Sequence, residues 1–280
     1  MSTNARALWA VARLDLAEAA RSRWMLFSGL VYAILGGAFV FVGMHESLVV
    51  GFSGMGRALM SLVHALLLLL PLFALSSTSQ VINRARDDGT LELLFSHPVN
   101  RGAYFLAITL TRYLVLTLPL CGLMLLMAAI GRAVFGQEIG WQFLLQAILI
   151  SAALVAAFVG AGIAISTFVR SQARAVIWTL LVWASSVALL DFLLIGAMLR
   201  WHLTPQAVFL LAALNPVQAA RMALLSGASN ELSVLGPVGF YLTHQIGPGA
   251  LFTLGVVWPL FLGAGLWGLA FARFRSTDLV

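Results

Sequence analysis

The chain has 280 residues, of which 61% are hydrophobic and only 9% are charged. A soluble domain carries about a quarter charged residues, so this composition excludes a soluble globular enzyme. All 16 cationic side chains are arginine, and the lack of lysine excludes Schiff-base chemistry and a P-loop of the G-x-x-x-x-G-K-[ST] kind for ATP. The single cysteine excludes an intrachain disulfide framework and a cysteine-rich zinc or iron–sulfur site.

Residues 1–23 precede the first long apolar stretch and predict an interfacial helix. From Ala5 to Arg23, apolar residues gather on one helical face and charged residues on the other. Such a helix lies in the headgroup region and turns into the membrane at Trp24. An ordinary solvated helix is the alternative that this pattern leaves open.

Six apolar stretches are each long enough to cross a bilayer, whose hydrocarbon core needs about 20 helical residues. They are residues 24–44, 58–79, 104–130, 142–168, 176–198 and 248–271. The run 207–214 is apolar but too short to span, so we expect it at an interface or in a packed loop. The predicted fold is an all-α integral membrane protein with six transmembrane helices over 24–271 and a tail over 272–280.

The distribution of arginine predicts the orientation of these helices, because cytoplasmic loops carry an excess of positive charge. With the N-terminus in the cytoplasm, the arginines outside are Arg57, Arg132, Arg200 and Arg221, and Arg112 lies within a span. The other eleven all fall on the inner side. We therefore expect both termini and the loop 80–103 in the cytoplasm, and the 49-residue segment 199–247 outside, with a short helix starting at Pro216.

The predicted cytoplasmic loop 80–103 contains a short amphipathic helix. Asp88 or Thr90 is a suitable N-terminal cap, and Pro98 ends the helix. The apolar face consists of Leu91, Leu94 and Phe95. Such a face suits docking into a groove on a cytoplasmic partner, and it equally suits a loop that lies on the membrane.

Two features of the later spans are informative. Asp191 lies about two-thirds of the way across the fifth span, where a charge is costly and is by default a functional candidate. It lines a cavity, contacts a second subunit, or is simply a polar residue near a helix end. In the fourth span, Ala152, Ala156, Gly160 and Ala164 form a face that lets another helix approach closely, in the same subunit or in a second copy.

The motif from Asp88 to Leu94, DGTLELL, followed by Pro98 and Arg101, resembles the cytoplasmic loop of type-2 ABC transporter permeases. Within that family the chain is most similar to the NosY group, whose transporter supports copper-site maturation of nitrous oxide reductase. Further matching segments are residues 21–24, 51–53, 190–194, 214–221 and 274–279.

This resemblance implies the permease subunit of an ABC exporter in the bacterial inner membrane, working as a homodimer with two copies of a separate ATPase. ATP and Mg would be held by that ATPase, and this chain would bind no cofactor and no nucleic acid. The residues implied in coupling to the ATPase are Arg86, Asp87, Asp88, Gly89, Thr90, Leu91, Glu92, Leu94 and Phe95. A NosD-like periplasmic protein would meet the outer loop at Asn215, Pro216 and Arg221.

Other functions fit the sequence less well. Met44 and His45 are adjacent, but no tight spacing of soft ligands indicates a metal site, and no motif indicates a membrane enzyme. A secondary transporter would need more intramembrane ionisable groups and inverted repeats. An ABC exporter for another substrate and a non-transporting anchor of a periplasmic assembly complex remain the alternatives.

Overall fold

The computed structural model describes residues 29–35, 37–38, 54–96, 100–135, 140–190, 192–193, 196, 200, 204–227 and 246–276, and these contain helices and no strand. The longest helices are α3 (Gly54–Thr78), α6 (Arg101–Phe135), α7 (Trp141–Phe168) and α13 (Pro248–Ser276). The shorter ones are α4 (Val81–Asp87), α5 (Thr90–Phe95), α8 (Gln172–Ala184) with the π-helix η1 (Ser185–Leu189), α10 (Pro205–Ala213) and α11 (Pro216–Gly227).

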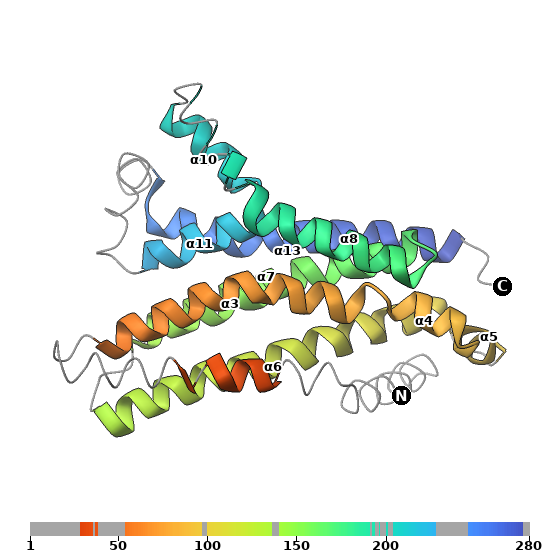
Figure 1. The fold of residues 1–280 in the computed structure, drawn as a ribbon, viewed down its shortest axis with the longest axis horizontal. Helices are drawn as coiled ribbons and strands as arrows, with labels where there is room; N and C mark the ends of the chain where they lie inside the picture. The colour runs from red at the N-terminus through yellow and green to blue at the C-terminus, as the bar shows by residue number, and fades with distance from the viewer. Residues whose placement is uncertain are drawn as a thin grey trace.

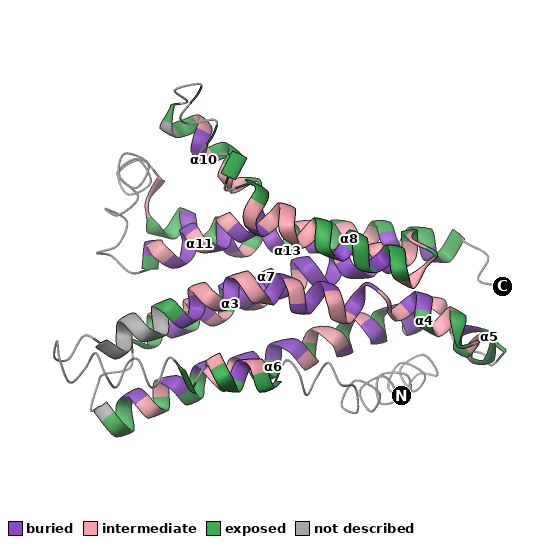
Figure 2. Cartoon of the chain, in the orientation of Figure 1, coloured by how far each residue is buried: buried purple, intermediate pink, exposed green. Residues whose placement is uncertain are grey.

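The long helices form one elongated bundle with α7 at its centre (Figure 1). Helix α7 packs against α3, α6, α11 and α13, and its residues are buried along most of its length (Figure 2). Helices α4 and α5 lie at one end of the bundle, here called the α5 end, where α13 also finishes (Figure 1). Helices α10 and α11 lie toward the opposite end (Figure 1).

Helices α7 and α13 approach so closely that glycine is required at the contact. A β-carbon added at Gly263 would lie 2.7 Å from the carbonyl oxygen of Ala156, and one added at Gly160 would collide with the backbone of Gly263. The small-residue face predicted for the fourth span thus packs on α13 of the same subunit. Close packing of this kind holds helices together in lipid, where the hydrophobic effect between helices is lost.

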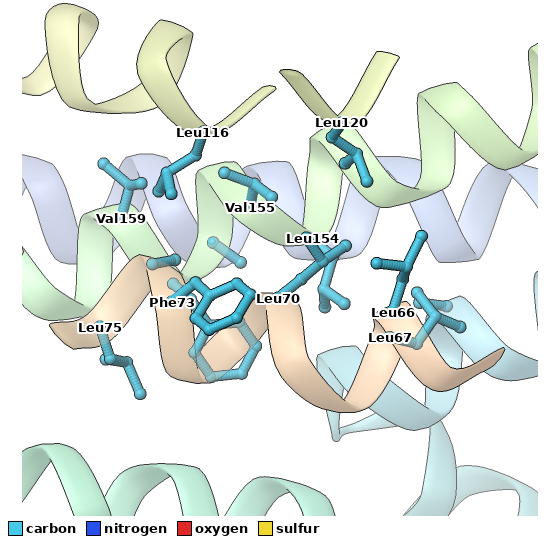
Figure 3. Packing of buried hydrophobic residues seen from close by; sticks show 14 of the residues in the cluster. Leu66, Leu67, Leu70, Phe73, Leu75, Leu116, Leu120, Leu154, Val155 and Val159 are labelled. Atoms are coloured by element: carbon cyan, nitrogen blue, oxygen red, sulfur yellow. The ribbon is translucent and has the colours of Figure 1, made fainter. Parts of the chain in front are cut away.

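A further part of the core consists mainly of aliphatic side chains from α3, α6 and α7 (Figure 3). They include Leu66, Leu67 and Leu70 of α3, Leu116 and Leu120 of α6, and Leu154, Val155 and Val159 of α7, all buried. Many weak dispersion contacts between these branched side chains fix α3 and α6 against α7.

Among the described residues, five helices are long and apolar enough to cross a membrane, and they correspond to the predicted spans 58–79, 104–130, 142–168, 176–198 and 248–271. The predicted first span, 24–44, is helical at 29–35 and 37–38, and its other residues lie outside the described residues. The interfacial helix predicted for residues 1–23 and the tail residues 277–280 also lie outside them.

The segment predicted as an outer loop folds partly into the bundle. Helices α10 and α11 form a bent pair at 115°, which would count as a sixth candidate span if it is one broken span or a re-entrant loop. Helix α11 begins at Pro216, as predicted, but it packs on α13 and α7 and most of its residues are buried. The alanine-rich surface of α11 fits closely against Gly255 of α13, so this part of the segment 199–247 packs into the bundle.

The contact between α7 and α13 generates a prediction about stability. Gly263→Ala should lower the thermal unfolding midpoint of the detergent-purified protein, because the added methyl group must displace the α7 backbone, at a cost of about 1–3 kcal/mol. Gly265→Ala and Gly268→Ala on the same helix are matched controls, since an added β-carbon meets nothing within 4 Å at either position. An equal unfolding midpoint for Gly263→Ala and the two controls would contradict the close approach.

Candidate functional site

The α4–α5 segment is anchored to the centre of the bundle at its start. The backbone N–H of Ile82 donates a hydrogen bond of 2.9 Å to Oγ of Ser166 on α7, and both residues are buried. Directly before it, Thr78 fills the space beside Gly162 of α7, where even a β-carbon would collide. The first turn of α4 is therefore fixed to α7.

A left-handed glycine separates α4 from α5. Gly89 has φ of 69°, a conformation that costs glycine little because it lacks a β-carbon. Asp88 is the C-cap of α4, and Gly89, which has no side chain to donate or accept, is the N-cap of α5. The predicted capping role of Asp88 or Thr90 was therefore wrong, because the chain reverses at Gly89 and α5 starts at Thr90.

The apolar face of α5 packs against the chain itself. Leu91 is only 1% exposed, and Leu94 and Phe95 are partly buried against the same core. The Phe95 ring meets the Tyr104 ring of α6 edge-on at 5.7 Å and lies 6.4 Å from the Phe274 ring of α13. The face predicted to meet a partner or the membrane is thus covered by α6 and α13, whose ends offer the aromatic surface that it needs.

This aromatic contact is reinforced by two arginines. The guanidinium of Arg101 lies 5.8 Å from the centre of the Phe95 ring and donates a hydrogen bond of 3.3 Å to the carbonyl oxygen of Arg275. Arg275 in turn lies over Phe271, 5.7 Å from the ring centre. The cation–π contact of Arg101 with Phe95 and its hydrogen bond to Arg275 therefore join α5, the start of α6 and the end of α13.

The outward face of α5 carries one large apolar residue that the sequence reasoning missed. Leu93 is 71% exposed. The other exposed residues from α4 to Glu92 are polar or charged: Arg84, Asp87, Asp88, Thr90 and Glu92. Helical spacing could have indicated this exposure, because the side chains at 91, 94 and 95 share one face of the helix and Leu93 lies outside that face.

The α4–α5 segment also contacts the start of α8. Nε2 of Gln172 donates a hydrogen bond of 2.7 Å to Oδ2 of Asp87. Arg86, one residue earlier, donates from Nη1 to Oδ1 of the buried Asn83 at 3.4 Å. Asp87 therefore has a partner in α8, while Arg86 braces α4 internally.

The three residues predicted to meet a periplasmic partner lie within the fold of this chain. Asn215 is 3% exposed, and its Nδ2 donates to the carbonyl oxygen of Ser186 at 2.6 Å. Its Oδ1 accepts a hydrogen bond of 3.0 Å from the backbone N–H of Val217. Pro216 is buried at the start of α11, and Arg221 on α11 is partly buried. Asn215 and Pro216 are thus packing residues, because α11 is inside the bundle.

The remaining candidates are not brought together by the described helices. Asp191, Met44 and His45 lie outside the described residues. Within the part of the chain that is described, no group of three or more His, Cys, Asp or Glu side chains could hold a metal ion.

Comparison with known proteins identifies the family. A family model described as "ABC-2 family transporter protein" matches residues 9–279. The chain belongs to the ABC-2 transporter family. It is 28% identical over 275 residues to the "Probable ABC transporter permease protein NosY" of Stutzerimonas stutzeri, covering 96% of this chain and 98% of that protein. It is 29% identical to the protein of the same name in Pseudomonas aeruginosa, covering 97% and 99%.

Family membership explains both the composition and the site. The chain is a multi-pass ABC permease, the membrane subunit of a transporter, and is not itself the catalytic subunit. A permease of this type implies an ATPase partner. The α4–α5 segment contains the DGTLELL motif and is the part of the permease that combines an anchored inner face with an exposed acidic and apolar face.

The two faces of α5 should respond differently to truncation. Leu91→Ala should destabilise the purified permease by about 2–5 kcal/mol, because it leaves a cavity in the core. Leu93→Ala should change stability by less than about 0.5 kcal/mol, because that side chain packs on little. Thermal unfolding of the two variants in the same detergent checks this, and equal losses of stability would contradict the assignment of the two faces.

Proposed function

We propose that this permease is the membrane subunit of an ABC exporter that is driven by a separate ATPase. It works as a homodimer in the bacterial inner membrane, with six spans per subunit and both termini in the cytoplasm. The ATPase supplies the ATP and Mg site, two copies bind to the permease dimer, and the permease itself holds no cofactor. The family match and the arginine distribution support this arrangement.

The single observation that carries the proposal is the two-sided character of α5. One side of this helix is fixed to α6 and α13 through Phe95 and buries Leu91, and the other presents Leu93 at 71% exposure next to the exposed Glu92. An exposed leucine beside an acidic side chain suits an apolar pocket with a basic rim on a partner. Leu93 is therefore the contact that inserts into the ATPase, with Asp88 and Glu92 at its edge.

The inner side of α5 explains how such a contact moves the membrane helices. Since Phe95 packs against Tyr104 and Phe274, a displacement of α5 displaces the start of α6 and the end of α13. The hydrogen bond from Ile82 to Ser166 passes the same displacement to α7. When the two ATPase subunits bind ATP and close together, the membrane helices therefore shift relative to one another as rigid, packed units.

The NosY relatives support a proposal for the role of this permease. We propose a NosY-like role in supporting copper-site maturation of nitrous oxide reductase, with a NosD-like periplasmic protein on the outer face. Full-length similarity at 28–29% identity supports this role. The alternatives are an ABC-2 exporter for another substrate and a non-transporting membrane anchor of a periplasmic assembly complex.

Affinity purification of the tagged permease from its native membranes tests the proposal. A protein with Walker motifs should co-purify in equal amount and hydrolyse ATP. Leu93→Asp should remove it by burying a charge in the contact, with a loss of affinity of at least about tenfold. Leu93→Met is the matched control and should retain it, because the side chain stays apolar and of similar volume.

Two outcomes separate the alternatives. Retention of the ATPase by Leu93→Asp would contradict the role of Leu93 and leave the ABC assignment intact. Absence of any ATPase from the unmodified preparation, with a periplasmic protein present, would favour the anchor.

A further inference from the structure

Helix α8, with η1, is the least buried of the five candidate spans in the described part of the chain. Of its 13 residues, only Ala175 and Thr179 are buried, whereas α7 is buried along most of its length (Figure 2). Its exposed side chains include Ile177, Trp178 and Leu181, which are apolar. Few contacts within the subunit hold α8, so it can shift against the tight α7–α13 pair.

Hydrogen bonds attach this loosely packed helix at defined points. At its start, Gln172 donates to Asp87 of α4 at 2.7 Å. Further along, the indole N–H of Trp183 donates to the carbonyl oxygen of Leu68 on α3 at 3.1 Å. Beyond its end, the carbonyl oxygen of Ser186 accepts the 2.6 Å hydrogen bond from Asn215.

The last of these attachments is made possible by the π-helix η1. The backbone N–H of Leu190 bonds to the carbonyl oxygen of Ser185, five residues earlier. In an α-helix the N–H of Leu190 would instead donate to the carbonyl oxygen of Ser186, four residues earlier. In η1 it does not, and Nδ2 of Asn215 donates to that oxygen. Backbone polar groups within a membrane need such a partner, and π-bulges of this kind often occur at functional sites.

Asn215 also organises the outer pair of helices. Its Oδ1 accepts the hydrogen bond from Val217 at the start of α11, while its Nδ2 reaches α8. The neighbouring carbonyl oxygen of Leu214 accepts a hydrogen bond of 3.1 Å from the indole of Trp258 on α13. The turn between α10 and α11 is thus held by the loosely packed α8 on one side and by the tightly packed α13 on the other.

We propose that α8 transmits movement of the α4–α5 segment to the α10–α11 turn, with Asn215 as the positioning residue at the output. This inference rests on the proposed function, because an ATPase must first move α5. Displacement of α4 pulls the start of α8 through Asp87 and Gln172. The carbonyl at Ser186 then carries the shift to Asn215 and changes the position of α10, which extends away from the bundle (Figure 1).

The test uses the ATPase complex and a reporter on α10. Cys121 is the only cysteine, so Cys121→Ser with Gln206→Cys gives a single thiol at an exposed position on α10. Maleimide labelling of that thiol is timed without nucleotide and after trapping with ATP and vanadate. The parent should show a change in labelling rate of at least about fivefold between the two states.

Asn215→Asp is the decisive variant, because it retains the acceptor for Val217 and removes the donor for Ser186. It should reduce the labelling change to less than about twofold while ATP hydrolysis stays close to that of the parent. Trp258→Phe is the matched control: it removes a hydrogen bond to the same turn from α13, and the labelling change should persist.

Each result decides between the inference and its alternatives. A full labelling change in Asn215→Asp overturns the inference, and so does the lack of any labelling change in the parent. In either case, ATP hydrolysis by the complex would still support the proposed function. If Asn215→Asp does not assemble, Gln172→Ala breaks the same route at its exposed start: loss of the labelling change supports the inference, and retention overturns it. Absence of ATPase from the parent complex defeats both.

Discussion

The close approach of α7 and α13 at Gly160 and Gly263 is the contact on which the rest of the structure depends. In lipid, helices gain little from the hydrophobic effect and associate through close packing, so a backbone-to-backbone contact is among the strongest available. It fixes the helix that crosses the centre of the bundle. Helices α3 and α6 then pack on α7 through branched side chains, and α11 packs on α13 at Gly255.

The tightly packed helices α7 and α13, here called the frame, contact different elements at the two ends of the bundle. At the α5 end, aromatic rings and Arg101 hold α5 against α6 and α13, which leaves Leu93 exposed. At the other end, the turn before α11 is held by hydrogen bonds from Asn215 and Trp258. Helix α8 lies beside the frame, few of its residues are buried, and it touches both ends. The arrangement suits a subunit that converts events at one membrane surface into movement at the other.

Hydropathy predicted the five long spans because a bilayer imposes a minimum apolar length, and proline at a helix start predicted Pro216. Spacing also grouped Leu91, Leu94 and Phe95 correctly, but periodicity gives no information about what a face packs against. The partner of that face comes from residues more than 150 positions later, at Phe274. For the same reason the buried role of Asn215 was missed: its acceptor is the carbonyl oxygen of Ser186 in the π-helix η1, which no local pattern in the sequence indicated.

The central claim is that α5 uses opposite faces for its own bundle and for the ATPase. Site-specific photo-crosslinking in native membranes tests it most directly, with p-benzoylphenylalanine placed at position 93 or at position 95. Position 93 should give an adduct with the mass of the permease plus the ATPase, and position 95 should give none, because its side chain faces α6 and α13. An ATPase adduct from position 95 and none from position 93 would contradict the account.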